Sequence, residues 1–184
     1  MLYMFVSAAP AIAQNQLRDI EANLQVVPIL AIVNIHEQKM LVYVGGVLKY
    51  EWATSTASSK NTDCTKGVCE TPIGTFGVTR QNRQAYSKKW DSPMPNATYF
   101  DNDGDAVHAA TQSEIAELGH PASHGCVRLH PANAQIFFDL VRHNQRGAHT
   151  YPGVTIRIIT GSSAPPILAP REKPKPTPKG IIAI

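Results

Sequence analysis

The residues of this chain best suited to chemistry lie in one short segment, Ser-His-Gly-Cys-Val-Arg at positions 123–128. Cys126 and His124 flank Gly125 in it, and a second histidine, His108, precedes the segment by fourteen intervening residues. A thiol must lose its proton to become a nucleophile, and an ordinary cysteine is mostly protonated at neutral pH. An imidazole that takes this proton completes the minimal set for covalent acyl transfer. Gly125 suits a tight turn whose backbone N–H groups can point at a developing oxyanion.

Three runs of sequence together carry a resemblance to a known family. The run SHGCVRL, the upstream VHAA with His108, and the earlier TPIGTFGV at 71–78 resemble the L,D-transpeptidase catalytic domain of the YkuD type. That family is marked by a histidine at this spacing before Ser/Thr-His-Gly-Cys, with Asn or Arg two positions after the cysteine. The resemblance implies acyl transfer on peptidoglycan stem peptides, with no cofactor.

The resemblance also implies roles for the two histidines. His108 is the expected base for Cys126, with its other ring nitrogen held by the backbone carbonyl of Ala109. Many members of the family have Gly or Ser where this chain has Ala109, and only the carbonyl is needed for this contact. His124 is expected to shape the pocket or to steady the acyl group.

The remaining residues of the motif have supporting roles in the same interpretation. Gly125 and Cys126 are expected to supply oxyanion N–H groups, and Ser123 to form a local hydrogen bond. Arg128 has two possible roles: its planar fork can contact a substrate carboxylate, or it can brace the loop.

For the reaction, the resemblance implies attack of Cys126 on the amide between diaminopimelate and a terminal D-Ala. D-Ala leaves, and an amine of a second stem peptide resolves the thioester to give a 3→3 cross-link. Water as acceptor would instead make an L,D-carboxypeptidase, and a protein amine would attach or release an outer-membrane protein. A non-catalytic wall-binding module is an alternative of another class, and a lone cysteine can also be a small buried core residue.

The sequence predicts neither a zinc site nor a calcium site. Zinc hydrolases generally have a helix-borne ligand pair and a carboxylate base, and neither surrounds the cluster of His108, His120, His124, Cys126 and His130. The acidic run at 101–105 lacks the glutamate that completes a calcium loop, so it predicts a solvated turn.

Composition places the chain among ordinary globular proteins. Its 184 residues suit one domain, with 43% apolar and 17% charged residues and a net charge of +3. The basic residues form no stripe, so no nucleic-acid partner is predicted.

The two ends of the chain differ from its middle. Residues 1–13 are uncharged and end in Ala-Ile-Ala, which favours a signal peptide cleaved after Ala13 over a short packed helix. Residues 14–27 are a lead-in, 28–161 the catalytic domain, and 162–184 a Pro/Lys-rich tail. The mature chain is expected to be periplasmic or secreted, without a transmembrane segment; oligomeric state is left open.

In an oxidising compartment Cys64 and Cys69 can form a local disulfide, which is favoured over half of a zinc site.

The elements expected around the site are mostly strands. β-branched runs predict strands at 29–35, 40–44 and 47–54, with a Gly45-Gly46 turn, and further strands at 71–78 and 154–159. His108 is expected at the end of a strand. Residues 80–105 are polar and turn-rich, so they predict a long loop, whose positions 94–95 and 99–100 resemble the wall of the family's substrate cleft. One helix is expected from Pro131, with Ile136, Phe137, Leu140 and Val141 on its buried face. Together they indicate a mainly β, L,D-transpeptidase-like mixed β-sandwich with one or two short helices.

Overall fold

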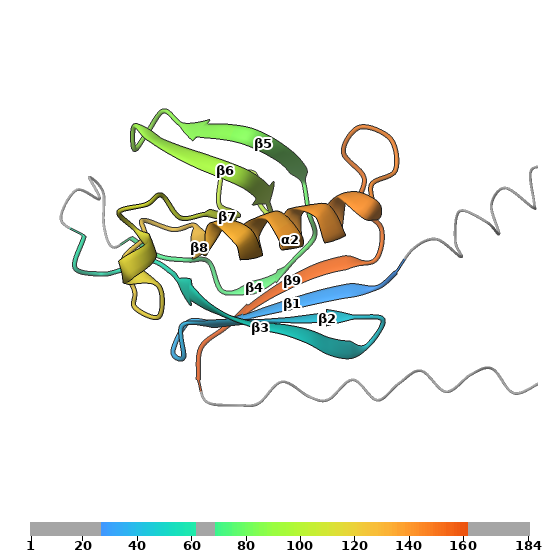
Figure 1. Cartoon of the computed structure of the whole chain (residues 1–184), viewed down its shortest axis with the longest axis horizontal. Helices are drawn as coiled ribbons and strands as arrows, with labels where there is room; N and C mark the ends of the chain where they lie inside the picture. Colours follow the sequence, from blue (N-terminus) through green and yellow to red (C-terminus); the bar gives the residue numbers. More distant parts are fainter. Residues whose placement is uncertain (1–26, 62–68, 162–184) are drawn as a thin grey trace, which may run out of the picture.

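The computed structural model of the protein describes residues 27–61 and 69–161. These residues form a nine-stranded mixed sheet in the order β4-β9-β1-β2-β3-β8-β7-β6-β5. The sheet curls so that its two ends face each other (Figure 1). The mainly β prediction is confirmed, and the two layers of the expected sandwich are the two halves of this one curled sheet. The signal peptide, most of the lead-in, Cys64 and the tail lie outside the described residues.

All neighbouring strands are antiparallel except two pairs, β1 with β9 and β7 with β8. The strands are β1 (Ile29–Asn34), β2 (Lys39–Val44), β3 (Val47–Ser55), β4 (Gly74–Phe76), β5 (Arg80–Ser87), β6 (Ser92–Tyr99), β7 (Ala106–Ala109), β8 (Val127–Leu129) and β9 (Val154–Ile159). The meander β1–β3 and β9 agree with the sequence patterns. The strand expected at 71–78 is reduced to the three residues of β4.

The long loop predicted over residues 80–105 is wrong. The structure instead has a β-hairpin there, in which β5 is the edge strand of the sheet. Its polar sequence is compatible with a strand because β5 is largely exposed. Pro93 and Pro95 lie in the part of β6 that pairs only with β5, so no second neighbour requires their missing N–H groups.

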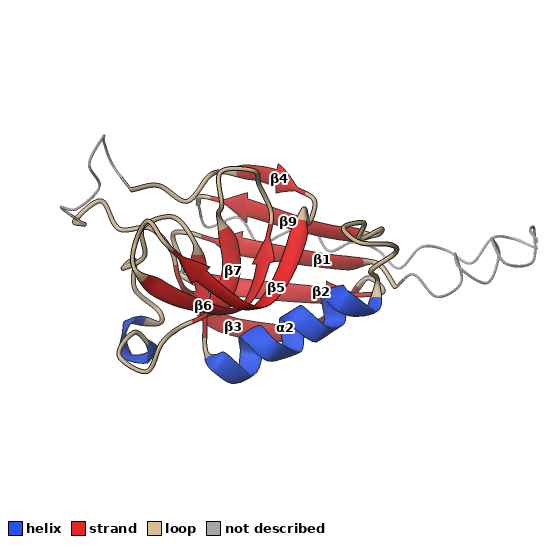
Figure 2. Cartoon of the chain, turned by 90° about the horizontal axis from the view of Figure 1, so that it is seen from above, coloured by secondary structure: helices blue, strands red, loops and turns tan. Residues whose placement is uncertain are grey.

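Helix α2 (Pro131–His143) begins directly after β8, with His130 as its N-cap: Ala132 N donates to His130 Nδ1. It lies in the opening between the two halves of the curled sheet and packs against β6, β7 and β8 (Figures 1 and 2). Its predicted buried face needs a correction, because Ile136 is 37% exposed while Phe138 is fully buried. The buried residues Ala134, Phe137, Phe138 and Val141 follow the i, i+3, i+4, i+7 spacing of one helix face.

A short 3₁₀ helix, η1 (Ile115–Glu117), lies in the crossover from β7 to β8. This crossover and the end of β7 are the parts of the fold that carry the sequence motif. The apolar core formed by β1, β2, β8, β9 and α2 lies behind them.

Candidate active site

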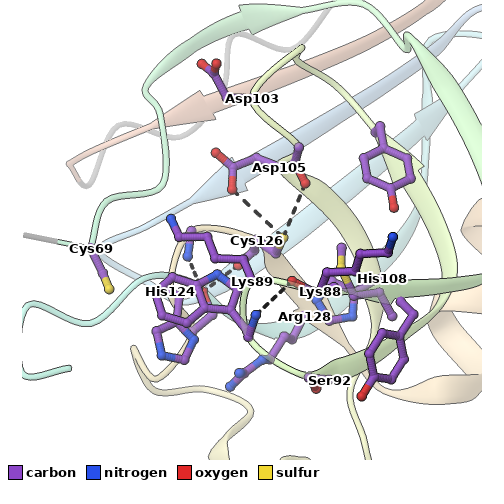
Figure 3. A pocket seen from close by; sticks show the side chains of 18 of the residues that line it. Cys69, Lys88, Lys89, Ser92, Asp103, Asp105, His108, His124, Cys126 and Arg128 are labelled. Atoms are coloured by element: carbon purple, nitrogen blue, oxygen red, sulfur yellow. Dashed lines mark hydrogen bonds between the residues drawn. The ribbon is translucent and has the colours of Figure 1, made fainter. Parts of the chain in front are cut away.

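The parallel pairing of β7 with β8 brings His108 and the Cys126 turn to one place. His108 is paired with Arg128 in the register of the two strands. Because side chains alternate along a strand, Cys126, two residues before Arg128, is on the same side of the sheet. All three line a cleft of about 850 Å³ (Figure 3). The structure therefore brings together the predicted nucleophile and base.

Hydrogen bonds from several elements hold the turn that carries Cys126. Ser123 Oγ donates to Cys126 O at 2.6 Å and accepts from Gly125 N at 3.3 Å. Thr71 Oγ1 donates to Gly125 O at 2.7 Å, and Asn61 Nδ2 donates to Ser123 O at 2.7 Å. Ser123 and Gly125 are buried, and these contacts hold the turn in place.

His108 is buried, with 5% of its surface exposed. Its Nδ1 lies 2.8 Å from Ala109 O, the carbonyl that the resemblance implied. A carbonyl only accepts, so Nδ1 carries the proton and Nε2 carries a lone pair. Burial lowers the pKa of His108 to about 4. The hydrogen bond to the Ala109 carbonyl has the opposite, smaller effect and raises this pKa. His108 is therefore a neutral imidazole, the form in which it can accept a proton.

Cys126 is partly exposed to the cleft. Its Sγ contacts Asp105 Oδ1 at 3.9 Å and Gly104 O at 4.0 Å, and among the described residues no hydrogen bond joins it to His108. Burial, and after it the charge of Asp105, raise the pKa of the Cys126 thiol to about 12. With this pKa the thiol is protonated at neutral pH.

Asp105 is the residue of the site that the sequence patterns missed. The solvated turn predicted for 101–105 is wrong for this position, because Asp105 is half-buried and lines the cleft. The preceding Asp101 does form a turn, with Oδ1 accepting from the backbone N of Asp103, Gly104 and Asp105. The sequence signal for Asp105 was its place directly before the strand that carries His108.

Burial, and after it the charge of Asp101, raise the pKa of Asp105 to about 6. A Cβ on Gly125 would lie 2.5 Å from Asp105 Oδ1, so a larger residue would displace the carboxylate from its position beside Cys126. Gly125 therefore allows Asp105 to lie against the nucleophile turn, residues 123–126.

Arg128 lines the cleft and also braces the crossover through two ion pairs. Its Nη2 lies 2.8 Å from Glu114 Oε1 and its Nη1 2.9 Å from Glu117 Oε2. Glu114 Oε2 in turn accepts from Thr111 N at 2.7 Å. Of the two roles considered for Arg128, this geometry favours bracing, because both terminal nitrogens already have carboxylate partners. Neither glutamate was singled out from the sequence.

His124 faces the β5–β6 hairpin. Its ring stacks on Trp90, with centroids 3.9 Å apart and planes 14° apart. Lys89 Nζ lies 4.6 Å from the centroid of the same Trp90 ring. Trp90 belongs to the turn between β5 and β6, so this stack joins the hairpin to the nucleophile turn. His124 thus contributes to the wall of the cleft.

Of the cysteines in the described residues, Cys126 is the free thiol and Cys69 is disulfide-bonded. Its predicted partner, Cys64, lies outside the described residues, so the pairing stays a prediction. In residues 27–61 and 69–161 no group of three His, Cys, Asp or Glu side chains is arranged to hold a metal ion. The same residues contain no helix long and apolar enough to cross a membrane.

Comparison with known families gives one match, which spans most of the domain. The L,D-transpeptidase catalytic domain family (YkuD) matches residues 28–147. The chain belongs to this family. Members act on peptidoglycan stem peptides and are typically associated with the cell wall.

Solved structures of L,D-transpeptidases share the fold. An L,D-transpeptidase from Mycobacterium smegmatis is 20% identical, with a TM-score of 0.58 over 72% of this chain and 59% of that chain. The L,D-transpeptidase from Xylanimonas cellulosilytica is 22% identical and has a TM-score of 0.56. The match covers 73% of this chain and 61% of that chain. L,D-transpeptidase 3 from Mycobacterium tuberculosis, with a faropenem-derived adduct, is 16% identical and has a TM-score of 0.56. The match covers 72% of this chain and 60% of that chain.

The chain thus covers about three fifths of these structures. No curated protein matches this chain. At these identities the structural likeness establishes the fold, and the domain match establishes the family.

Proposed function

We propose that this protein is a peptidoglycan L,D-transpeptidase that works through a Cys126 acyl-enzyme. The observation that carries the proposal is the pairing in one cleft of a partly exposed thiol with a buried, neutral His108. The Ala109 carbonyl holds His108 in the tautomer whose Nε2 can accept a proton. Membership of the family supports the same assignment.

In the first half-reaction, Cys126 attacks the carbonyl between diaminopimelate and the terminal D-Ala. His108 Nε2 accepts the thiol proton as the C–S bond forms, because a thiol with so high a pKa is not ionised beforehand. The C–N bond to D-Ala then breaks, His108 returns this proton to the departing amine, and a thioester remains. The amine of a second stem peptide then attacks the thioester and forms the 3→3 cross-link. One amide replaces another, so the exchange needs no nucleotide.

The proposed compartment is periplasmic or secreted, with residues 1–13 as a signal peptide. The disulfide at Cys69 supports it, because disulfides persist mainly in oxidising environments.

The test is incubation of the purified protein with disaccharide-tetrapeptide, followed by mass analysis of the products. Cross-linked dimer and free D-Ala support the transpeptidase. Tripeptide alone indicates an L,D-carboxypeptidase, and unchanged substrate with a folded protein indicates a wall-binding module.

A β-lactam probe tests the acyl-enzyme by itself. One structural neighbour is described with a faropenem-derived adduct, so a penem is a suitable reagent. A mass increase equal to one penem, present in the parent protein and missing in Cys126→Ser, supports the nucleophile. An adduct on the Cys126→Ser variant contradicts it.

A further inference from the structure

Asp105 places a carboxylate against the reacting sulfur. Its Oδ1 lies 3.9 Å from Cys126 Sγ, inside the cleft (Figure 3). Among the described residues no lysine, arginine or histidine forms an ion pair with it. A half-buried carboxylate without a cation is costly, so such a group next to a nucleophile requires an explanation.

The chain is built to keep this carboxylate in place. Asp101 Oδ1 accepts from the backbone N of Asp105 at 2.9 Å, which fixes the turn before β7. Gly125 leaves room for Asp105 Oδ1 where any Cβ would lie 2.5 Å from it. One feature thus fixes the backbone of Asp105, and the other leaves space for its carboxylate beside Cys126.

A negative charge here works against the first half-reaction, because the charge of Asp105 raises the pKa of the thiol. In the second half-reaction the thiol is acylated, and Asp105 loses Sγ–H as a hydrogen-bond partner. The attacking group must then reach the thioester carbon, which is bonded to Sγ. An amine arrives at neutral pH as an ammonium, which a carboxylate at this distance can bind.

We propose that Asp105 selects the acyl acceptor: it binds the ammonium of the incoming amine beside the Cys126 thioester, takes one of its protons, and so favours aminolysis over hydrolysis. The inference rests on the proposed function and adds the residue that recognises the acceptor amine, in its ammonium form. It makes Asp105, and not the histidines, the residue that separates transfer from hydrolysis.

In this step, the ammonium gives one proton to the Asp105 carboxylate, and the freed amine lone pair forms the C–N bond to the thioester carbon. The C–S bond then breaks, and the second proton of the nitrogen goes to Cys126 Sγ, which restores the thiol. Asp105 releases its proton to water.

Other charged groups of the cleft are less suited to this task. His108 is buried, its Nδ1 is held by the Ala109 carbonyl, and as a neutral imidazole it offers no charge to an ammonium. Lys88 and Lys89 line the cleft from the hairpin turn and carry the wrong charge for an ammonium. Asp103 also lines the cleft, but it is exposed and no hydrogen bond joins it to Cys126.

The test measures how one acyl-enzyme partitions between two acceptors. The full chain is given disaccharide-tetrapeptide at pH 7.5, and the ratio of cross-linked dimer to tripeptide is measured for parent, Asp105→Asn and Asp103→Asn. We expect the ratio to fall about tenfold or more in Asp105→Asn, the usual effect of losing a charge-assisted hydrogen bond. In Asp103→Asn it should stay within about threefold.

A second acceptor separates charge recognition from a structural effect. Hydroxylamine is uncharged at neutral pH, so its partition to hydroxamate should be equal in parent and Asp105→Asn. An unchanged dimer-to-tripeptide ratio in Asp105→Asn overturns the inference, as does an equal loss with hydroxylamine. A parent protein that acylates but releases only tripeptide overturns it too. A parent protein that never forms an acyl-enzyme instead overturns the proposed function.

Discussion

Two arginines of this molecule form ion pairs of similar length in very different surroundings. Arg128 contacts Glu114 and Glu117 at 2.8 and 2.9 Å with its side chain 11% exposed. Arg83 contacts Asp139 at 2.7 Å with its side chain 48% exposed. The ion pairs of Arg128 join β8 to the crossover from β7, and that of Arg83 joins β5 to α2.

The difference extends to the two walls of the cleft. The wall formed by β7, β8 and the nucleophile turn, here called the floor, is buried and held by hydrogen bonds from Thr71 and Asn61. The wall formed by β5 and β6, here called the cover, has a largely exposed edge strand, β5, and meets the floor through the pairing of β6 with β7 and through the Trp90–His124 stack. We infer that the floor holds the reacting groups in position, while the cover controls how substrate enters the cleft. Substitutions on the floor should therefore reduce activity and stability far more than substitutions on the cover.

The largest effect is expected at the nucleophile. Cys126→Ser should reduce penem adduct formation and cross-linking to undetectable levels, because an alcohol of much higher pKa cannot replace the thiol. The measurement is intact mass after penem treatment, with product analysis in parallel. Cys64→Ser is the control and should keep most of the activity. Equal losses in the two variants would contradict the assignment of Cys126.

The next effect tests the buried ion pairs. Arg128→Met should lower the free energy of unfolding by about 3–5 kcal/mol, because it leaves the carboxylate of Glu114 buried without its cation. Arg83→Met, with an exposed partner, should cost less than about 1 kcal/mol. Urea unfolding at pH 7 measures both. Similar losses would remove the contrast between floor and cover.

The third effect separates the two histidines. His108→Ala should slow penem acylation of Cys126 by about 10²-fold with little change in penem affinity, as for loss of a general base. His124→Ala, which loses a stacking contact, should acylate at closer to the parent rate. Adduct formation followed against time by intact mass gives both rates. An inert His124→Ala beside a normal His108→Ala would reverse the roles.

The elements that pack behind the floor, and the motif within the floor, could be predicted from the sequence because their signals are local. The β-branched runs of β1 and β9 and the Pro131 start of α2 are patterns within single elements. The motif at 123–128 likewise concentrates chemistry in consecutive residues. The family resemblance then joined His108 to Cys126 across the fold.

The cover and the partners of the motif could not be predicted in the same way. β5 has too few apolar residues to show a strand pattern, and its pairing with β6 depends on an edge position that only the sheet defines. Asp105 and Glu114 act through contacts made when β7, β8 and the crossover fold together. Phe138 is buried and Ile136 exposed because the surroundings of α2 select its face.

A smaller effect is expected from the charge of Asp105 on stability. Its folded pKa of about 6 lies above the usual 3.8, so the folded protein binds the proton more tightly and stability falls as pH rises through this window. The full difference is worth about 3 kcal/mol, and solvent around a half-buried carboxylate reduces it to about 1–2 kcal/mol. Asp105→Asn should be more stable than the parent by that amount at pH 8 and equal to it near pH 3. Urea unfolding at both pH values decides this, and a variant that is less stable at pH 8 contradicts it.

The smallest effect is expected on the cover. Trp90→Ala removes the ring that stacks on His124 at 3.9 Å. Aromatic contacts of this kind contribute about 0.5–1.5 kcal/mol, so the second-order rate of penem acylation should fall by about 2–10-fold. The loss should appear as weaker penem binding, with the maximal acylation rate unchanged within about twofold, because neither Cys126 nor His108 contacts the hairpin turn through a hydrogen bond. Acylation rates measured across a range of penem concentrations separate weaker penem binding from a lower maximal acylation rate. A fall in the maximal rate as large as that of His108→Ala would mean that the cover positions the reacting groups as strictly as the floor does.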